Sequence, residues 1–157
     1  MNQEVKSING YSVKDEKAIR TYDTVTLRKA DRKLKQGQHV KTRGYYNIND
    51  GGSAEYYITN TSSESDYQEG LENGLYATLI VEDVINVKQV GIYEDDTHDD
   101  SDKLISLISK NVSQNFKIKG NNSYCKVTKT IDIPCYSNIE DLWINFYVGT
   151  YVNNYGI

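Results

Sequence analysis

The sequence predicts a mainly β protein with short helices, and three observations indicate this fold class. Tyrosine occurs 14 times among 157 residues, and a large ring carrying a hydroxyl suits half-buried strands and hydrated interfaces. The Asp-Gly pair at residues 50–51 separates two β-rich segments, as in hairpins that need positive φ angles. From Phe116 onward, short strand-like segments alternate with polar corners without hairpin turns, which is typical of the rungs of a β-solenoid.

Residues 1–35 are expected to form an arm or short helices. After the acidic pair at residues 15–16, which favours a helix N-terminus, apolar residues recur every three or four positions: Ala18, Ile19, Tyr22 and Val25. A second short amphipathic stretch covers residues 27–34 and ends before Gly37. Neither apolar stripe is wide enough to fold alone, so both must pack against another part of the molecule.

Residues 36–86 are expected to form a small β-rich domain. Two strands, within 38–48 and 53–60, should be joined by a tight turn at 49–52, where Asp-Gly supplies positive φ angles. A polar, glycine-punctuated loop follows at 61–74, and residues 75–85 form a further apolar strand region.

Residues 87–157 are expected to hold one helix and the first of the repeated strands. An acidic loop at 94–102 precedes the helix, which Asp99, Asp100 or Ser101 can cap and which should end near Asn111. The buried face of the helix is predicted to consist of Leu104, Ile105, Leu107 and Ile108. Strand-like segments then follow at 116–120, 123–133 and 138–152.

The charge distribution is strongly uneven along the chain. Residues 1–43 carry a net charge of +6, residues 44–102 of −13, and residues 103–157 of +3. Such polarity is compatible with nucleic acid, with a partner surface or with complementary subunits. The basic segment has no arrayed arginines and little aromatic interleaving, so we expect docking or subunit pairing and no nucleic acid.

Cysteine usage and hydropathy point to a soluble cytoplasmic product. No apolar run approaches the roughly 18 residues of a membrane span, and the polar first residues do not resemble a signal peptide. Cys125 and Cys135 lack metal-ligand spacing, and reduced buried thiols are the favoured interpretation. A disulfide or a metal site between them is the alternative.

One segment, residues 34–58, resembles a stretch found ahead of the β-helix in bacteriophage tailspikes and appendage proteins. Its glycines suit a loop with positive φ angles. The matching positions are Leu34, Gly37, Val40, Thr42, Gly44, Tyr45, Tyr46, Asp50, Gly51, Gly52, Ala54, Tyr56 or Tyr57, and Ile58, of which Tyr57 is assigned to the motif.

A second segment, residues 87–104, resembles the opening of the pectate-lyase-like β-helix family. The matching residues are Val87, Gly91, Asp95, Asp99, Asp100 and Leu104. In that family the acidic residues start a helix that caps the β-helix end. Glu94 and Asp96 stand where the family has glycines on either side of the first aspartate, which implies an altered turn. The resemblance covers roughly residues 34–140.

The resemblance implies a mainly β fold in which a small virion-attachment domain precedes a capping helix and the first rungs of a right-handed parallel β-helix. It also implies a homotrimer in the virion tail, made in the host cytoplasm. The basic arm would dock to a tail, portal or baseplate protein, and a longer C-terminal β-helix would bind or cleave host surface glycan. This chain is then expected to be the base of a longer spike.

The acidic loop, the two histidines and the serines of the helix are the polar groups from which a catalytic or metal site could be built. The acidic loop 94–102 lacks the order of a calcium loop, so helix-terminal charge is favoured over a metal site or a pair of glycosidase acids. His39, His98 and the serines of the helix have no nucleophile motif around them. We therefore assign no catalytic residue, no cofactor and no metal.

The aromatic residues around Trp143 could stack on a sugar, but a β-helix lumen or a subunit seam is favoured for them; they are Tyr136, Phe146, Tyr147 and Tyr151. A structural attachment module is accordingly the leading hypothesis. A portion of a polysaccharide depolymerase and a glycan-binding module are the alternatives.

Overall fold

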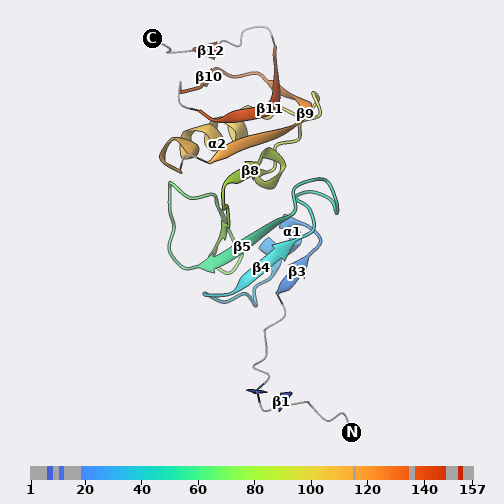
Figure 1. The fold of residues 1–157 in the computed structure, drawn as a ribbon, viewed down its shortest axis with the longest axis vertical. Coiled ribbons are helices and arrows are strands. Elements are labelled where there is room, and N and C mark those ends of the chain that lie inside the picture. Colours follow the sequence, from blue (N-terminus) through green and yellow to red (C-terminus); the bar gives the residue numbers. More distant parts are fainter. Residues whose placement is uncertain are drawn as a thin grey trace.

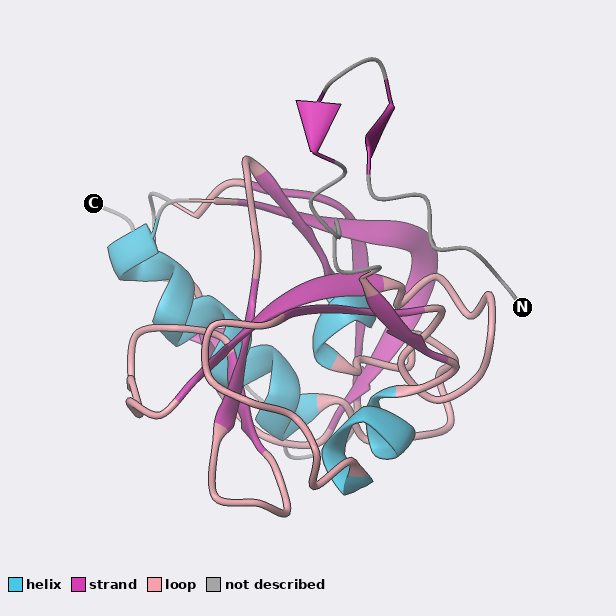
Figure 2. Cartoon of the chain, turned by 90° about the horizontal axis from the view of Figure 1, so that it is seen from below, coloured by secondary structure: helices cyan, strands magenta, loops and turns pink. Residues whose placement is uncertain are grey.

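The structure, a computed structural model, describes residues 7–8, 11–12, 19–114, 116–134, 137–147 and 152–153. Along the long axis of the molecule, a five-stranded sheet comes first, helix α2 (Ser101–Gln114) follows, and parallel strands lie beyond it (Figure 1). Strands and loops make up most of the chain, and the view from below shows α2 as the longest helix (Figure 2). The predicted mainly β fold with short helices is confirmed at this level.

The five-stranded sheet has the order β3-β4-β5-β7-β6. Its strands are β3 (Arg20–Tyr22), β4 (His39–Thr42), β5 (Ala54–Thr59), β7 (Tyr76–Leu79) and β6 (Gln68–Gly70). The β3–β4 pair is parallel and the other pairs are antiparallel. Along β4 and β5 every second side chain is buried, which is the alternation expected when one face of a sheet covers a core.

The prediction of helix around residues 18–25 is wrong for the part that the structure describes. Residues 20–22 form β3, because they pair with β4, and α1 begins only at Val25 and ends at Ala30. Thr24 caps this short helix by accepting a hydrogen bond from the N–H of Leu27 (3.3 Å). Tertiary pairing has overridden a weak local helical pattern. The division at residue 35 therefore does not coincide with an edge of this sheet.

The hairpin of residues 38–60 exists, but its turn is not tight. Strands β4 and β5 are antiparallel, with Thr42 opposite Ala54, so residues 43–53 form the connection between them. Within it, Asn49 and Gly51 have positive φ angles of 63° and 89°. The connection is long because Asp50 binds backbone N–H groups of the loop itself, as described below.

A second sheet contains three parallel strands in the order β11-β9-β8: β8 (Val84–Asn86), β9 (Lys117–Val127) and β11 (Ile139–Phe146). Ile85, Ile118 and Ile139 are in register across them. Strand β10 (Ile131–Asp132) pairs in parallel with β12 (Val152–Asn153). Parallel stacking of segments separated along the chain agrees with the predicted rungs. The described sheets are open, so they do not by themselves define a right-handed β-helix.

Helix α2 runs on to Gln114, beyond the predicted end at Asn111, and follows the 3-10 helix η1 (Val87–Val90). As predicted, Leu104, Leu107 and Ile108 are buried, and Ile105 is partly buried. The separate antiparallel pair of β1 (Ser7–Ile8) and β2 (Tyr11–Ser12) lies in the N-terminal part. In the described part of the chain, no helix combines the length and the apolar character needed to cross a membrane.

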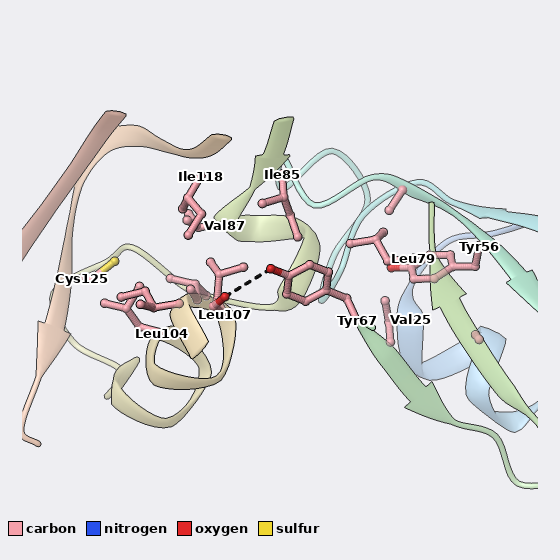
Figure 3. Close-up of a cluster of buried hydrophobic side chains, with 14 of the residues drawn as sticks. Val25, Tyr56, Tyr67, Leu79, Ile85, Val87, Leu104, Leu107, Ile118 and Cys125 are labelled. Carbon is pink, nitrogen blue, oxygen red and sulfur yellow. Dashed lines mark hydrogen bonds between the residues drawn. The ribbon is translucent and has the colours of Figure 1, made fainter. Parts of the chain in front are cut away.

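One buried cluster connects the two sheets. It extends from Val25 and Tyr56 through Tyr67 to Leu107 and Ile118 (Figure 3). The Tyr67 hydroxyl donates a hydrogen bond to the carbonyl of Leu107 (3.2 Å), so the residue that precedes β6 is bound directly to the backbone of α2. The five-stranded sheet and the parallel strands therefore share a core.

Candidate functional site

The first half of the predicted motif is organised by one carboxylate. Asp50 accepts hydrogen bonds from the N–H groups of Tyr45, Tyr46, Asn47 and Gly52 at 2.7–3.0 Å. Burial acts to raise the pKa of the Asp50 carboxyl, but the four N–H donors outweigh it and lower the pKa below its usual value. Glycine is required at Gly44 in the same loop, because a Cβ there would lie 1.7 Å from the carbonyl oxygen of Asn47.

The two motif segments meet around the ammonium group of Lys103. Tyr46 donates to the carbonyl of Gly91 at 2.7 Å, and Lys103 donates to the same carbonyl at 2.6 Å and to the Tyr46 hydroxyl. The rings of Tyr45, Tyr46 and Tyr93 surround the ammonium, with centroids 5.2, 4.8 and 5.3 Å away. Burial lowers the pKa of Lys103. Glycine is required at Gly91, where φ is 80° and a Cβ would lie 2.4 Å from the Tyr45 ring.

The acidic loop binds its own backbone and Thr128, the residue that follows β9. Asp100 is buried and accepts from the N–H groups of Tyr93 and Glu94, and burial raises its pKa. Asp99 accepts from Ser101 and Thr128, and these hydrogen bonds lower the pKa of Asp99 to about 2. Asp95 accepts from the N–H groups at positions 97 and 98. Among the described residues, no three His, Cys, Asp or Glu side chains converge as metal ligands would.

The turn at residues 94–96, for which an altered geometry is expected, has a left-handed backbone at both positions where glycine is replaced. Glu94 and Asp96 have φ angles of 48° and 58°, in the left-handed region that favours glycine. Hydrogen bonds hold them there: the Glu94 carboxylate accepts from the N–H of Asn121 at 2.8 Å, and Asp96 accepts from the Asn145 amide at 3.0 Å. Tertiary contacts from β9 and β11 thus replace the conformational freedom of glycine.

The remaining motif residues lie along β4, β5 and the turn before them. Val40 and Thr42 are buried on the inner face of β4, and Gly37 precedes that strand with a φ of 84°. Tyr56 faces the core at 2% exposure, whereas Tyr57, the residue assigned to the motif, is 40% exposed. His39 is packed edge-on against Tyr57.

One buried ion pair in the site was not predicted. The Arg28 side chain is fully buried, binds the Glu69 carboxylate and lies 3.7 Å above the Tyr56 ring. Glu69 also accepts from the Tyr45 hydroxyl at 2.6 Å, and burial raises the pKa of that phenol. Nothing in the local sequence signals this pair, because an arginine in a short basic amphipathic helix normally faces solvent.

The outer face of the parallel strands carries aromatic side chains. Trp143 packs edge-on against Tyr124, and the two residues are 46% and 44% exposed. Tyr147 is exposed beside them, with Lys126 4.8 Å from its ring centroid. The exposure of Trp143, Phe146 and Tyr147 does not agree with the lumen part of the prediction, and a subunit seam stays a prediction. Tyr136 and Tyr151 lie outside the described residues.

Cys135, one of the two cysteines for which reduced buried thiols are predicted, also lies outside the described residues. Cys125 is buried with a free thiol, and burial raises the pKa of that thiol.

Comparison with known proteins gives fold relatives and no sequence relatives. Neither a protein-family model nor a curated protein sequence matches the chain. The structure is similar to a tailspike protein of an Acinetobacter baumannii bacteriophage, a capsular polysaccharide depolymerase. The TM-score is 0.59 at 13% identity, over 83% of this chain and 23% of that one.

Two further matches come from an Escherichia coli O157:H7 bacteriophage. Its full-length tailspike protein 2 matches with a TM-score of 0.52 at 14% identity, over 90% of this chain and 24% of that one. The enzymatically active domain of tailspike protein 2 matches with a TM-score of 0.54 at 14% identity, over 88% of this chain and 27% of the domain. The chain thus has a tailspike-like fold and spans about a quarter of the length of these proteins.

Proposed function

We propose that this chain is the base of a phage tailspike, a structural module of the virion tail that holds a receptor-binding parallel β-helix. The observation that carries this proposal is the junction around Lys103 and Gly91, together with the core shared by both sheets. Hydrogen bonds and packed rings join the β4–β5 loop to α2 and to the residues that follow η1, and the buried cluster continues from there to the parallel strands. A spike that transmits force between virion and cell needs such a rigid base.

The proposal includes three finer parts. The parallel strands β8, β9 and β11 continue into a right-handed β-helix of the pectate-lyase-like type. Three copies associate into a homotrimer, and residues 1–35 dock to a tail, portal or baseplate protein. The stacking of β8, β9 and β11 supports the first part, and the net charge of +6 over residues 1–43 supports the docking of the basic arm. The homotrimer rests on the resemblance to tailspikes.

Two experiments test assembly. Light scattering of the full chain at micromolar concentration should give the mass of three copies, and a monomer would contradict the trimer. Phage whose parent spike carries Lys33→Glu and Lys35→Glu, at two exposed basic positions of this segment, should assemble virions that lack the spike. Normal spike content in those virions would contradict the docking role, and the thermal unfolding of the double variant serves as the control for its fold.

The second candidate function is catalytic: the chain would be a portion of a polysaccharide depolymerase. One comparison favours this function specifically. The fragment whose fold matches 88% of this chain is described as an enzymatically active domain, so the counterpart of this chain lies within a catalytic fragment. The exposed aromatic face of Tyr124, Trp143 and Tyr147 supports contact with glycan, since sugar rings stack on such side chains.

Incubation with host capsule separates the two functions. If the chain is only a base, no new reducing ends appear. If it carries depolymerase activity, reducing ends accumulate with time, and Trp143→Ala slows their release.

A further inference from the structure

A cleft of about 230 Å³ separates the five-stranded sheet from helix α2. One wall comes from β5, β6, β7 and the residue before β6, and the other from η1 and α2. The apolar lining consists of the rings of Tyr56 and Tyr67 with Leu79, Val90 and Leu107. The polar lining consists of Gln68, Glu69, Gln89, Asp102, Lys103, Ser106 and Lys110. This volume is below that of a drug-sized pocket and suits a ligand of about ten non-hydrogen atoms.

The lining of the cleft carries two carboxylates, of Glu69 and Asp102, and two ammonium groups, of Lys103 and Lys110. Glu69 is already engaged by Arg28 and by the Tyr45 hydroxyl, and Asp102 forms an ion pair with Lys129 at 2.6 Å. Lys103 takes part in none of the ion pairs of the described residues, and its hydrogen-bond partners are the neutral Tyr46 hydroxyl and Gly91 carbonyl. Asp100 and Glu69 act on this ammonium only from beyond ion-pair distance, and burial still lowers the pKa of Lys103, so a charged acceptor in direct contact would stabilise the ammonium.

Three further donors, in or behind the wall of the cleft, have no hydrogen-bond acceptor in the described part of the chain. Tyr56 lines the cleft at 2% exposure, and its hydroxyl makes no hydrogen bond with a described group. Behind its ring, the Nε and Nη1 groups of the fully buried Arg28 also lack acceptors. Buried donors are normally satisfied, and each one left unpaired carries a desolvation cost. The Lys103 ammonium and these donors favour an acceptor that carries negative charge.

We propose that this cleft, which we name the interlayer cleft, binds a small organic anion. The carboxylate or phosphate group of the ligand accepts from Lys103 and from the Tyr56 hydroxyl. Its apolar body packs between Leu79, Val90 and Leu107. The site is independent of the proposed role as a spike base, and the bound anion adds contacts between α2 and the five-stranded sheet.

Chemical-shift titration of the full chain by NMR tests the proposal with benzoate as the probe. Benzyl alcohol has the same ring and no charge, and phenyl phosphate separates phosphate from carboxylate as the preferred anion. Benzoate or phenyl phosphate should saturate with a Kd of about 1 mM, as suits so small a ligand. Benzyl alcohol should bind at least about tenfold more weakly, the loss expected for one charge-assisted hydrogen bond.

Two variants locate the binding. Ser106→Trp, at an exposed position on the cleft wall, should abolish the titration, and Ser109→Trp, an exposed position on the same helix outside the lining, should leave it unchanged. Lys103→Gln should weaken benzoate binding about tenfold; if this variant does not fold, the tryptophan pair decides. The proposal is overturned if neither anion gives a saturable shift, if benzyl alcohol binds as tightly, or if Ser106→Trp binds like the wild type.

Discussion

At the scale of single residues, the Asp50 carboxylate is the group on which the β4–β5 connection depends. Its two oxygens each accept two backbone N–H groups, so the side chain does what a strand or helix does elsewhere and satisfies the donors of an irregular loop. The same loop presents Tyr45 and Tyr46 to Glu69, Gly91 and Lys103. The conformation of one loop therefore determines whether the junction forms.

Asp50→Asn should destabilise the protein by about 2–3 kcal/mol at pH 7, because the amide NH2 then faces two N–H donors. The folded-state pKa of Asp50 is lowered, so its contribution is present above the unfolded pKa of about 4 and is lost as pH falls through the folded pKa. The gap between variant and wild type should therefore narrow below pH 4. Urea unfolding at pH 7 and pH 3 measures it.

Asp83→Asn is the matched control, since the Asp83 side chain is exposed. Its stability should follow that of the wild type at both pH values. An Asp50→Asn variant as stable as the wild type at pH 7 would contradict the assigned role of the carboxylate.

At the scale of elements, the turn at 94–96 shows how a strained backbone is maintained. An L-residue in the left-handed region costs roughly 1 kcal/mol. Glu94 is nearly fully buried, and its carboxylate binds β9. Asp96 is half-buried, and its carboxylate accepts from the Asn145 amide of β11 at 3.0 Å and from the exposed Tyr147 hydroxyl at 3.4 Å. Equal backbone strain therefore comes with unequal side-chain contacts.

Glu94→Gly should destabilise the protein by about 1–3 kcal/mol, because the N–H of Asn121 loses its acceptor and the relief of strain offsets only part of this. Asp96→Gly should stay within about 1 kcal/mol of the wild type, since the relief of strain nearly cancels the loss of two partly exposed hydrogen bonds, one of them long. Denaturant midpoints of the two variants rank them. The reverse order would show that backbone strain dominates at both positions.

The isoleucine stack is the second feature at this scale. Ile118 is fully buried between Ile85 and Ile139 in the parallel sheet. Ile118→Ala should cost about 2–5 kcal/mol, the sum of lost transfer free energy and an unfilled cavity. Lys119→Ala on the same strand removes only long, exposed ion pairs and should cost less than about 1 kcal/mol. Equal losses in thermal unfolding would contradict the burial of the stack.

At the scale of the whole molecule, the core shared by the two sheets predicts one cooperative unfolding transition. Trp143, the single tryptophan, reports on β11 by fluorescence, and far-UV circular dichroism reports on the whole chain. The two urea curves should coincide. Tyr67→Phe, which removes the hydrogen bond to Leu107, should lower both midpoints together. Separate midpoints for the two probes would show that the sheets unfold independently.

The fold class, the strands of residues 39–59 and the buried face of α2 follow from local patterns. The alternation along β5 and the spacing of Leu104, Leu107 and Ile108 depend only on neighbouring residues, so the sequence shows them directly. The glycines at 44 and 91 and the aspartates at 50 and 100 were likewise recognisable, because loops with positive φ angles and helix starts admit few residue types.

Only the tertiary structure determined what these residues contact. Arg28 and Glu69 are 41 positions apart in the chain, and Tyr46 and Lys103 are 57 apart. Strand β3 likewise exists only because β4 lies beside it, against a local pattern that favoured helix. Local sequence thus determined that this is a β-rich chain with a capped helix and glycine-dependent loops. The buried ion pair, the cage around Lys103 and the cleft arose from folding, because contacts between distant residues leave no periodic signal in the sequence.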